Sequence, residues 1–158
     1  VNQNLRYKGF ELSMFGQGVT GTMVRFYQEQ SWAFSDNASP REFHLKRWTV
    51  DNPDPNAAYP RIYPRTSTHS TFNNKFSDFW LFDSDYFRIK NITFGYNFNK
   101  SQIQHLGVDA LKLYVSAENP FTIRADKRME DFDPETPSGR GTDTRGSSSI
   151  SLGVNLTF

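Results

Sequence analysis

Hydrophobic and polar residues alternate along several segments of the chain, and this period of two is typical of β-strands, whose successive side chains point to opposite faces. The clearest segment is SSSISLGVNLTF, where one face carries Ile150, Leu152, Val154, Leu156 and Phe158. The same pattern predicts four strands, which cover about 5–15, 80–98, 110–119 and 148–158.

The segments between these predicted strands differ greatly in length. Residues 99–109 form a short link, whereas about 16–79 and about 120–147 are long and polar. In an antiparallel set, both long segments leave one end of the sheet and the short link lies at the other end. Outer-membrane β-barrels have this asymmetry, and their tilted strands need roughly 9–11 residues. A soluble β-sandwich also has alternating strands, so alternation alone does not choose between the two.

The composition indicates large rings set among polar side chains. The 158 residues are 36% hydrophobic and 16% aromatic, with a mean hydropathy of -0.68. The net charge of +1 creates no general field that would attract nucleic acid, so no nucleic-acid partner is expected. The absence of cysteine excludes disulfides and cysteine-based metal sites. The start lacks a signal-peptide pattern, so we expect either a protein that is not exported or a piece of a longer one.

No motif for covalent chemistry occurs in the sequence. His44, His69 and His105 lack metal-ligand spacing, and there is no nucleophile elbow or phosphate-binding loop. The acidic stretch MEDFDPE could hold calcium, but it lacks the spacing and central glycine of an EF-hand, and a solvated loop is the alternative. We therefore expect no enzyme activity, no metal site and no cofactor.

The segment 16–79 is rich in aromatic residues and proline, which favours an ordered, functional loop. Ser39 as N-cap and Pro40 at the first helical position predict a short helix over about 40–48. The aromatic rings of this loop are its candidate binding groups. They could stack on sugars, dock a partner or pack the loop itself, and they include Trp32, Phe34, Trp48 and Tyr59.

A resemblance to a known family extends over nearly the whole chain. It is carried, in order, by LRYKGFELSMFGQGVTG, RWTVDNPDPNAAYPR, NNKFSDFWLFDSDYFRIKNITFGYNF, LKLYVSAENPFTI, DPE and SLGVNLTF. These stretches resemble the C-terminal part of the SusC/RagA family of TonB-dependent outer-membrane transporters of Bacteroidota. The resemblance implies an all-β fold made of the C-terminal four antiparallel strands of a 22-stranded transmembrane β-barrel. Residues 16–79 and 120–147 would be extracellular loops, and 99–109 a periplasmic turn.

The resemblance further implies a part of an active nutrient importer in the bacterial outer membrane, with the C-terminus in the periplasm. A SusD-like surface lipoprotein would close over the barrel, and Trp32, Trp48 and Tyr59 are candidate contacts to it or to the substrate. TonB–ExbB–ExbD would supply energy through N-terminal parts that this sequence lacks, including the plug and the TonB box. Glycan fragments and oligopeptides both fit as cargo. The alternatives are a soluble β-sandwich carbohydrate-binding module and an outer-membrane structural or adhesion barrel without transport.

The last predicted strand has a second interpretation within this family. Its apolar face would be a signal for the outer-membrane assembly machinery, carried by Leu152, Val154, Leu156 and Phe158. The alternative is a soluble protein that ends in a strand. Four strands with open edges would leave backbone groups unsatisfied in the lipid bilayer, so we do not expect this segment to span a membrane by itself. Rings at both ends of the strand over about 80–98 are expected at the membrane interfaces.

Overall fold

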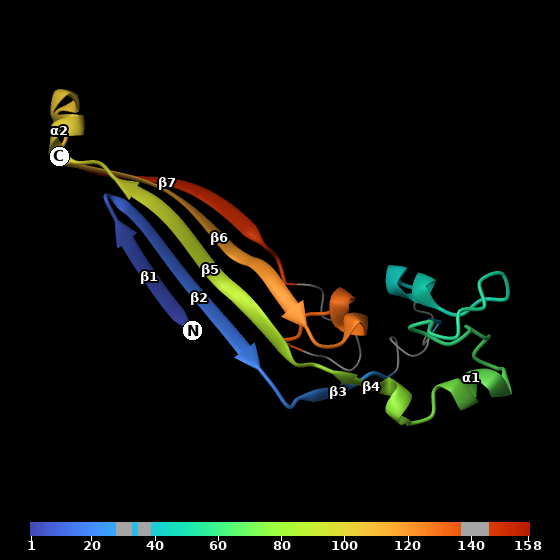
Figure 1. Ribbon diagram of the computed structural model, residues 1–158. Coiled ribbons are helices and arrows are strands. Elements are labelled where there is room, and N and C mark those ends of the chain that lie inside the picture. The colour runs from blue at the N-terminus through green and yellow to red at the C-terminus, as the bar shows by residue number, and fades with distance from the viewer. Residues whose placement is uncertain (28–32, 35–38, 137–145) are drawn as a thin grey trace. The chain divides into compact units, whose positions relative to one another are not determined.

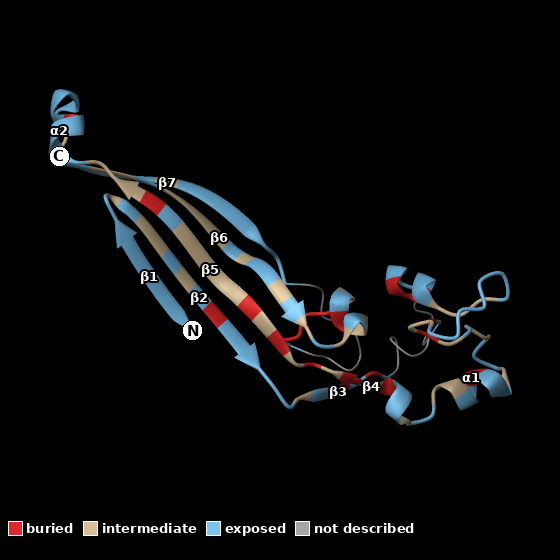
Figure 2. Cartoon of the chain, viewed as in Figure 1, coloured by how far each residue is buried: buried red, intermediate tan, exposed pale blue. Residues whose placement is uncertain are grey.

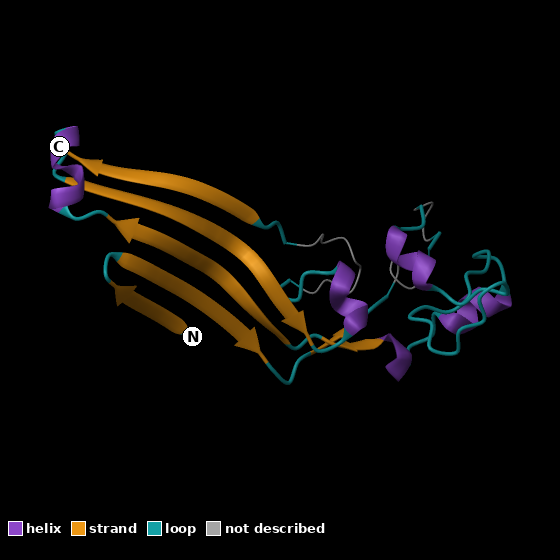
Figure 3. Ribbon diagram, turned by 45° about the horizontal axis from the view of Figure 1, so that its top comes forward, coloured by secondary structure: helices purple, strands orange, loops and turns teal. Residues whose placement is uncertain are grey.

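Strands dominate the regular structure of the computed structural model, which describes residues 1–27, 33–34, 39–136 and 146–158. The chain divides into two compact units (Figures 1 and 3). The sheet unit comprises residues 1–19, 86–123 and 146–158, and the loop unit comprises residues 20–85 and 124–145. Among the described residues, no helix combines the length and the apolar character needed to cross a membrane.

The sheet unit is built on a five-stranded sheet with the order β1-β2-β5-β6-β7. Its strands are β1 (Asn2–Tyr7), β2 (Phe10–Val19), β5 (Tyr86–Asn97), β6 (Ala110–Arg124) and β7 (Ser149–Thr157). The pairs β1/β2, β2/β5 and β6/β7 are antiparallel. A short link of α2 (Lys100–Ile103) and η4 (Gln104–Leu106) joins β5 to β6. This link and the β1–β2 turn lie at one end of the sheet, and both long segments leave the other end (Figure 1).

The prediction of a single strand over about 5–15 is wrong, because a two-residue hairpin turn divides it into β1 and β2. Lys8 and Gly9 have positive φ angles of 45° and 91°, as the tight hairpin turn requires at both of its central positions. Tyr7 pairs directly with Phe10 across the turn. The alternation therefore continues through the turn without a break, and the sheet has five strands instead of the expected four.

The strand expected over about 80–98 is also divided. Its first part is β4 (Leu81–Asp83), which pairs with β3 (Met23–Arg25) in a separate two-stranded sheet. The break follows at Ser84 and Asp85, where the Asp85 carboxylate accepts the backbone N–H groups of Gly21 and Thr22 at 2.8 and 2.7 Å. These hydrogen bonds hold the Asp85 pKa below its ordinary value. Asp85 thus ends one short sheet just before β5 begins.

One further boundary differs from the predicted one. The strand expected over about 110–119 continues to Arg124, past Asn119 and Pro120. Asn119 has a φ of 46°, a left-handed conformation that asparagine tolerates better than most residues. The Ser148 hydroxyl donates to the Asn119 carbonyl at 2.8 Å and so keeps the chain before β7 close to β6.

The register of the sheet separates apolar from polar side chains. Leu5 lies opposite Leu12, and Leu12 lies opposite Phe94, so one face stays apolar across three neighbouring strands. In the β6–β7 pair, Leu113 lies opposite Val154. Many of these apolar side chains are exposed, and Ile150 and Leu152 have exposed fractions of 78% and 86%. Figure 2 colours most of β7 as exposed. The opposite face carries Glu, Lys, Asn, Ser and Thr.

The loop unit has a core of its own, made mostly of rings. The cluster consists of Val24, Phe26, Phe43, Tyr59, Trp80, Phe82, Met129 and Phe132. Phe26 lies at its centre, with ring centroids 4.1 Å from Phe82 and 4.6 Å from Phe132. Around the core lie η2 (Glu42–Lys46), α1 (Thr68–Asn73), η3 (Asp78–Trp80) and η5 (Lys127–Asp131).

The helix expected over about 40–48 is a shorter 3-10 helix, η2, and Arg41 takes the N-cap position instead of Ser39. The reason is the buried side chain of His44, whose Nδ1 accepts the Arg41 backbone N–H at 3.0 Å. This hydrogen bond satisfies a backbone donor at the start of the helix. The Ser39 hydroxyl was expected to accept from a donor there as the N-cap.

The hairpin turn gives a first testable prediction. Gly9→Val should destabilise the full-length protein by about 2 kcal/mol or more, because a β-branched residue is strained at positive φ and its Cβ would lie 2.8 Å from the Asn97 carbonyl oxygen. Lys8→Asn is the matched control, since asparagine accepts this conformation. Thermal unfolding of the two variants measures the difference, and equal midpoints would contradict the assigned turn.

Candidate functional site

The polar face of the five-stranded sheet is the first candidate site. Glu11 on β2 forms ion pairs with Arg6 and with Lys112, which reaches it from β6. The strand between them, β5, has Gly95 directly opposite Glu11. A Cβ at Gly95 would lie 3.0 Å from the Lys112 Cε. The missing side chain at Gly95 therefore gives Lys112 room to pass over β5.

Hydrogen bonds between uncharged side chains continue along this face. Ser116 Oγ lies 3.3 Å from Asn91 Nδ2 and 3.0 Å from Thr93 Oγ1. Farther along, the buried Arg88 donates from Nε to Thr122 Oγ1 at 2.9 Å. These groups can bind water and polar solutes, but in these hydrogen bonds of the described residues no nucleophile is paired with a base.

Tyr114 and Gly153 face each other across the β6–β7 pair on the same polar face. The Tyr114 ring lies so close over Gly153 that any Cβ there would overlap the phenol. An aromatic ring packed over a cross-strand glycine stabilises the pairing of the two strands. This contact fixes the position of β7 against β6.

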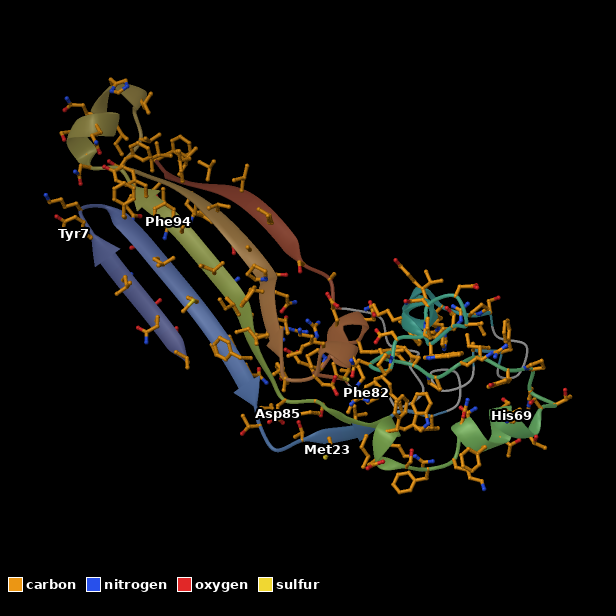
Figure 4. The ribbon with its side chains drawn as sticks, turned by 45° about the vertical axis from the view of Figure 1, so that its right-hand side comes forward. Tyr7, Met23, His69, Phe82, Asp85 and Phe94 are labelled. Atoms are coloured by element: carbon orange, nitrogen blue, oxygen red, sulfur yellow. The ribbon has the colours of Figure 1, made fainter. Side chains whose placement is uncertain are left out.

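Aromatic rings gather at the hairpin end of the sheet unit, where Figure 4 labels Tyr7 and Phe94. Phe10 stacks on Phe94 with ring centroids 5.7 Å apart and an interplanar angle of 16°. It also contacts Tyr96 at 4.7 Å, and Tyr96 meets the edge of Phe98 at 4.8 Å. Such a group of rings next to an apolar face is typical of the membrane–water interface.

The loop residues expected to contact substrate or a partner have different positions. Trp32 lies outside the described residues. Trp48 is half-buried, and its backbone N–H donates to the Tyr59 carbonyl at 2.9 Å. Tyr59 is only 3% exposed and packs against Phe43 and Trp80. Its ring therefore belongs to the core of the loop unit instead of presenting a face for stacking. Burial raises the pKa of the Tyr59 phenol far above its ordinary value.

Arg128 is the main polar anchor of the loop unit, and sequence reasoning did not identify it. Its guanidinium donates to both carboxylate oxygens of Asp126 at 2.6 to 3.1 Å and to the Phe79 carbonyl at 2.9 Å. It also lies 3.8 Å above the Phe82 ring, which Figure 4 labels. Burial alone would raise the pKa of Asp126, but the hydrogen bonds from Arg128 outweigh it and hold the pKa below its ordinary value.

The acidic stretch MEDFDPE is held by the protein itself. Asp131 forms an ion pair with Lys46 at 2.7 Å, and Glu130 lies 3.6 Å from the same ammonium. The hydrogen bond with Asp131 raises the pKa of Lys46. Within residues 1–27, 33–34, 39–136 and 146–158, no group of three or more His, Asp or Glu side chains is arranged to hold a metal ion.

Comparison with known proteins gives relatives of one kind. No family model matches the chain. It is 26% identical over 151 residues to the TonB-dependent receptor P3 of Formosa agariphila, covering 96% of this chain and 14% of that receptor. The chain therefore spans about one seventh of the length of this curated relative.

Solved structures show a likeness in fold. The RagAB peptide importer in its closed-closed state matches 96% of this chain, with a TM-score of 0.61 and 19% identity. Its open-open state matches with a TM-score of 0.56. In each case the chain covers 16% of the solved chain. The prediction of an all-β fold is confirmed by this likeness and by the strands described above.

Arg128 supplies the second prediction. Arg128→Ala should destabilise the loop unit by about 2 kcal/mol, because it leaves the Asp126 carboxylate and backbone carbonyls without their charged donor. Lys127→Ala is the matched control, since the neighbouring Lys127 side chain is exposed. Hydrogen exchange of residues 39–85 in the full-length protein measures the effect, and equal protection in both variants would contradict the anchoring role.

Proposed function

We propose that this chain, which matches a fragment of a SusC/RagA-type TonB-dependent receptor, forms part of the barrel wall and outer loops of an outer-membrane nutrient importer. The observation that carries the proposal is the exposed apolar face of the five-stranded sheet. Side chains such as Ile150 and Leu152 are largely exposed there, across from a polar, hydrogen-bonded face.

The two faces suit a barrel better than the soluble alternative. A β-sandwich carbohydrate-binding module would bury the apolar face against a second sheet. In water, an apolar face of this extent would be an aggregation hazard, whereas in a bilayer it meets lipid tails. The polar face would then line the wet interior, where the Glu11–Lys112 pair and the Ser116 hydrogen bonds lie.

The sheet edges support a larger barrel around this fragment. Among the described strands, β1 and β7 each have a neighbour on one side only. In lipid, unpaired strand edges are unfavourable, so further strands must cover both. A 22-stranded barrel, of which this fragment forms the C-terminal part, supplies them. Its assembly signal comprises Leu152, Val154 and Leu156, which lie on the exposed apolar face of β7, together with Phe158.

The orientation follows from the segments that join the strands. Both long segments leave the same end of the sheet, which we assign to the cell exterior, and the 99–109 link with the C-terminus faces the periplasm. A SusD-like lipoprotein closes over the exterior end. The structurally similar RagAB importer supports this, because its name denotes two components. TonB–ExbB–ExbD drives import through other parts of the receptor. Oligopeptides or glycan fragments are the cargo.

The barrel wall is tested by two lysine substitutions on adjacent residues of β7. Leu152→Lys places a charge on the lipid face and should cost about 2–4 kcal/mol of barrel stability. Ser151→Lys adds the same charge to the polar face and should be tolerated. Heat-modifiable mobility and outer-membrane abundance of the full-length receptor measure both. Equal loss in the two variants, or tolerance of both, would contradict the assigned faces.

Transport is tested by uptake. Cells that carry the full-length receptor should accumulate labelled oligopeptide or oligosaccharide only when TonB is present. A lipoprotein should co-purify with the receptor in detergent. Uptake that does not depend on TonB would reject energised import and leave a barrel without active transport.

A further inference from the structure

A surface patch of the loop unit combines exposed rings with two cations, and we call it the cation–ring patch. It consists of Arg25, Tyr27, Phe72, Lys75 and Phe76. The Arg25 guanidinium lies 4.6 Å from the Phe76 ring centroid and 5.8 Å from that of Tyr27. The Lys75 ammonium lies 5.3 Å from the Phe72 ring. Phe72 is 70% and Phe76 64% exposed, so these rings are not part of the core.

The rings are exposed because the backbone directs them outward. Along β3 and the next residues, Val24 and Phe26 point into the aromatic cluster, so Arg25 and Tyr27 lie on the opposite face. The segment after α1 is held by the Asn73 carbonyl, which accepts the Trp80 Nε1–H at 2.8 Å. The patch therefore has a fixed backbone beneath it and is not needed to complete the core.

The two cations of the patch lack acidic partners within the described part of the chain. Their side-chain contacts in that part of the chain are with rings, and no carboxylate there forms an ion pair with Arg25 or Lys75. The acidic residue on the same face of the β3–β4 pair, Asp83, lies opposite Met23 and accepts the Asp85 backbone N–H. Hydrogen-bond donors of both cations thus remain available to a partner.

We propose that the cation–ring patch docks an acidic surface of a separate protein, whose carboxylates bind Arg25 and Lys75 while its apolar side chains cover Phe72 and Phe76. Arginine and aromatic residues are enriched in such interfaces, and complementary charge provides specificity. This inference rests on the proposed function, because it assigns the surface by which the receptor contacts its lipoprotein.

The cation–π contacts also suit a partner that associates and dissociates. When the partner is absent, Arg25 and Lys75 lie over the rings and cover part of their surface with a hydrated charge. When it binds, the same cations can turn toward carboxylates without leaving the rings. The exposed rings are therefore tolerated in both states.

The first experiment identifies the occupant of the patch. A photo-crosslinking phenylalanine analogue replaces Phe76 in the full-length receptor in its native outer membrane. We expect a crosslink to a separate polypeptide, at a segment containing Asp or Glu. The control is the analogue at Leu45, which is 72% exposed and lies outside the patch. A crosslink from position 76 only to the receptor's own chain, or an equal yield from position 45, would overturn the proposal.

The second experiment tests the charges. Arg25→Glu combined with Lys75→Glu should weaken lipoprotein binding by about tenfold in co-purification, and replacing the crosslinked carboxylate of the partner by lysine should restore it. Lys127→Glu, an exposed charge reversal elsewhere in the same unit, should leave binding unchanged. Equal unfolding midpoints verify that the variants are folded. Unchanged binding in the double variant would overturn the proposal.

The outcomes separate this inference from the proposed function. If the wild-type receptor retains its lipoprotein and imports cargo while the double variant behaves identically, the patch assignment fails and the importer stands. If the wild-type receptor retains no lipoprotein, the proposed partnership fails and the patch assignment fails with it.

Discussion

The pairing register of the five-stranded sheet is the constraint on which the other features depend. Because successive side chains alternate in direction, a slip of one residue would move every apolar side chain of a strand to the polar face. The structure fixes the register at both sides of the sheet. The Lys8–Gly9 turn sets β1 against β2, and the Tyr114 ring over Gly153 sets β7 against β6. The separation of the faces, and hence the proposed place of the sheet in a membrane, follows from these contacts.

The two units differ in how they bury their apolar side chains. The sheet unit leaves its apolar face uncovered, and lipid would complete it. The loop unit buries its rings in a cluster around Phe26 and anchors η5 through Arg128. A long segment between strands with such a core can present a surface of fixed shape, which a structureless loop of the same length would not. The cation–ring patch depends on this order.

The sequence predicted the strands because alternation is a local property. It did not predict the features that depend on contacts between distant parts of the chain. The turn at Lys8 and Gly9 keeps the alternation in phase, so nothing in the pattern marked it. The break at Asp85 depends on backbone donors of Gly21 and Thr22, more than sixty positions away. For Tyr59 the sequence left stacking on a sugar, docking a partner and packing the loop open, because its neighbours Phe43 and Trp80 come from other segments. The Arg128 anchor has no sequence signature for the same reason.

The ion pair between Glu11 and Lys112 joins two strands that are not neighbours, and Gly95 on the strand between them makes it possible. These three positions therefore constrain one another although they are far apart in the chain. A side chain at position 95 would be costlier while the pair is present than after its loss, although Tyr114 and the Leu113 backbone would still crowd it. Among divergent relatives, the three positions should accordingly change together. Replacement of the glycine before loss of the ion pair should be the rarest order of substitution.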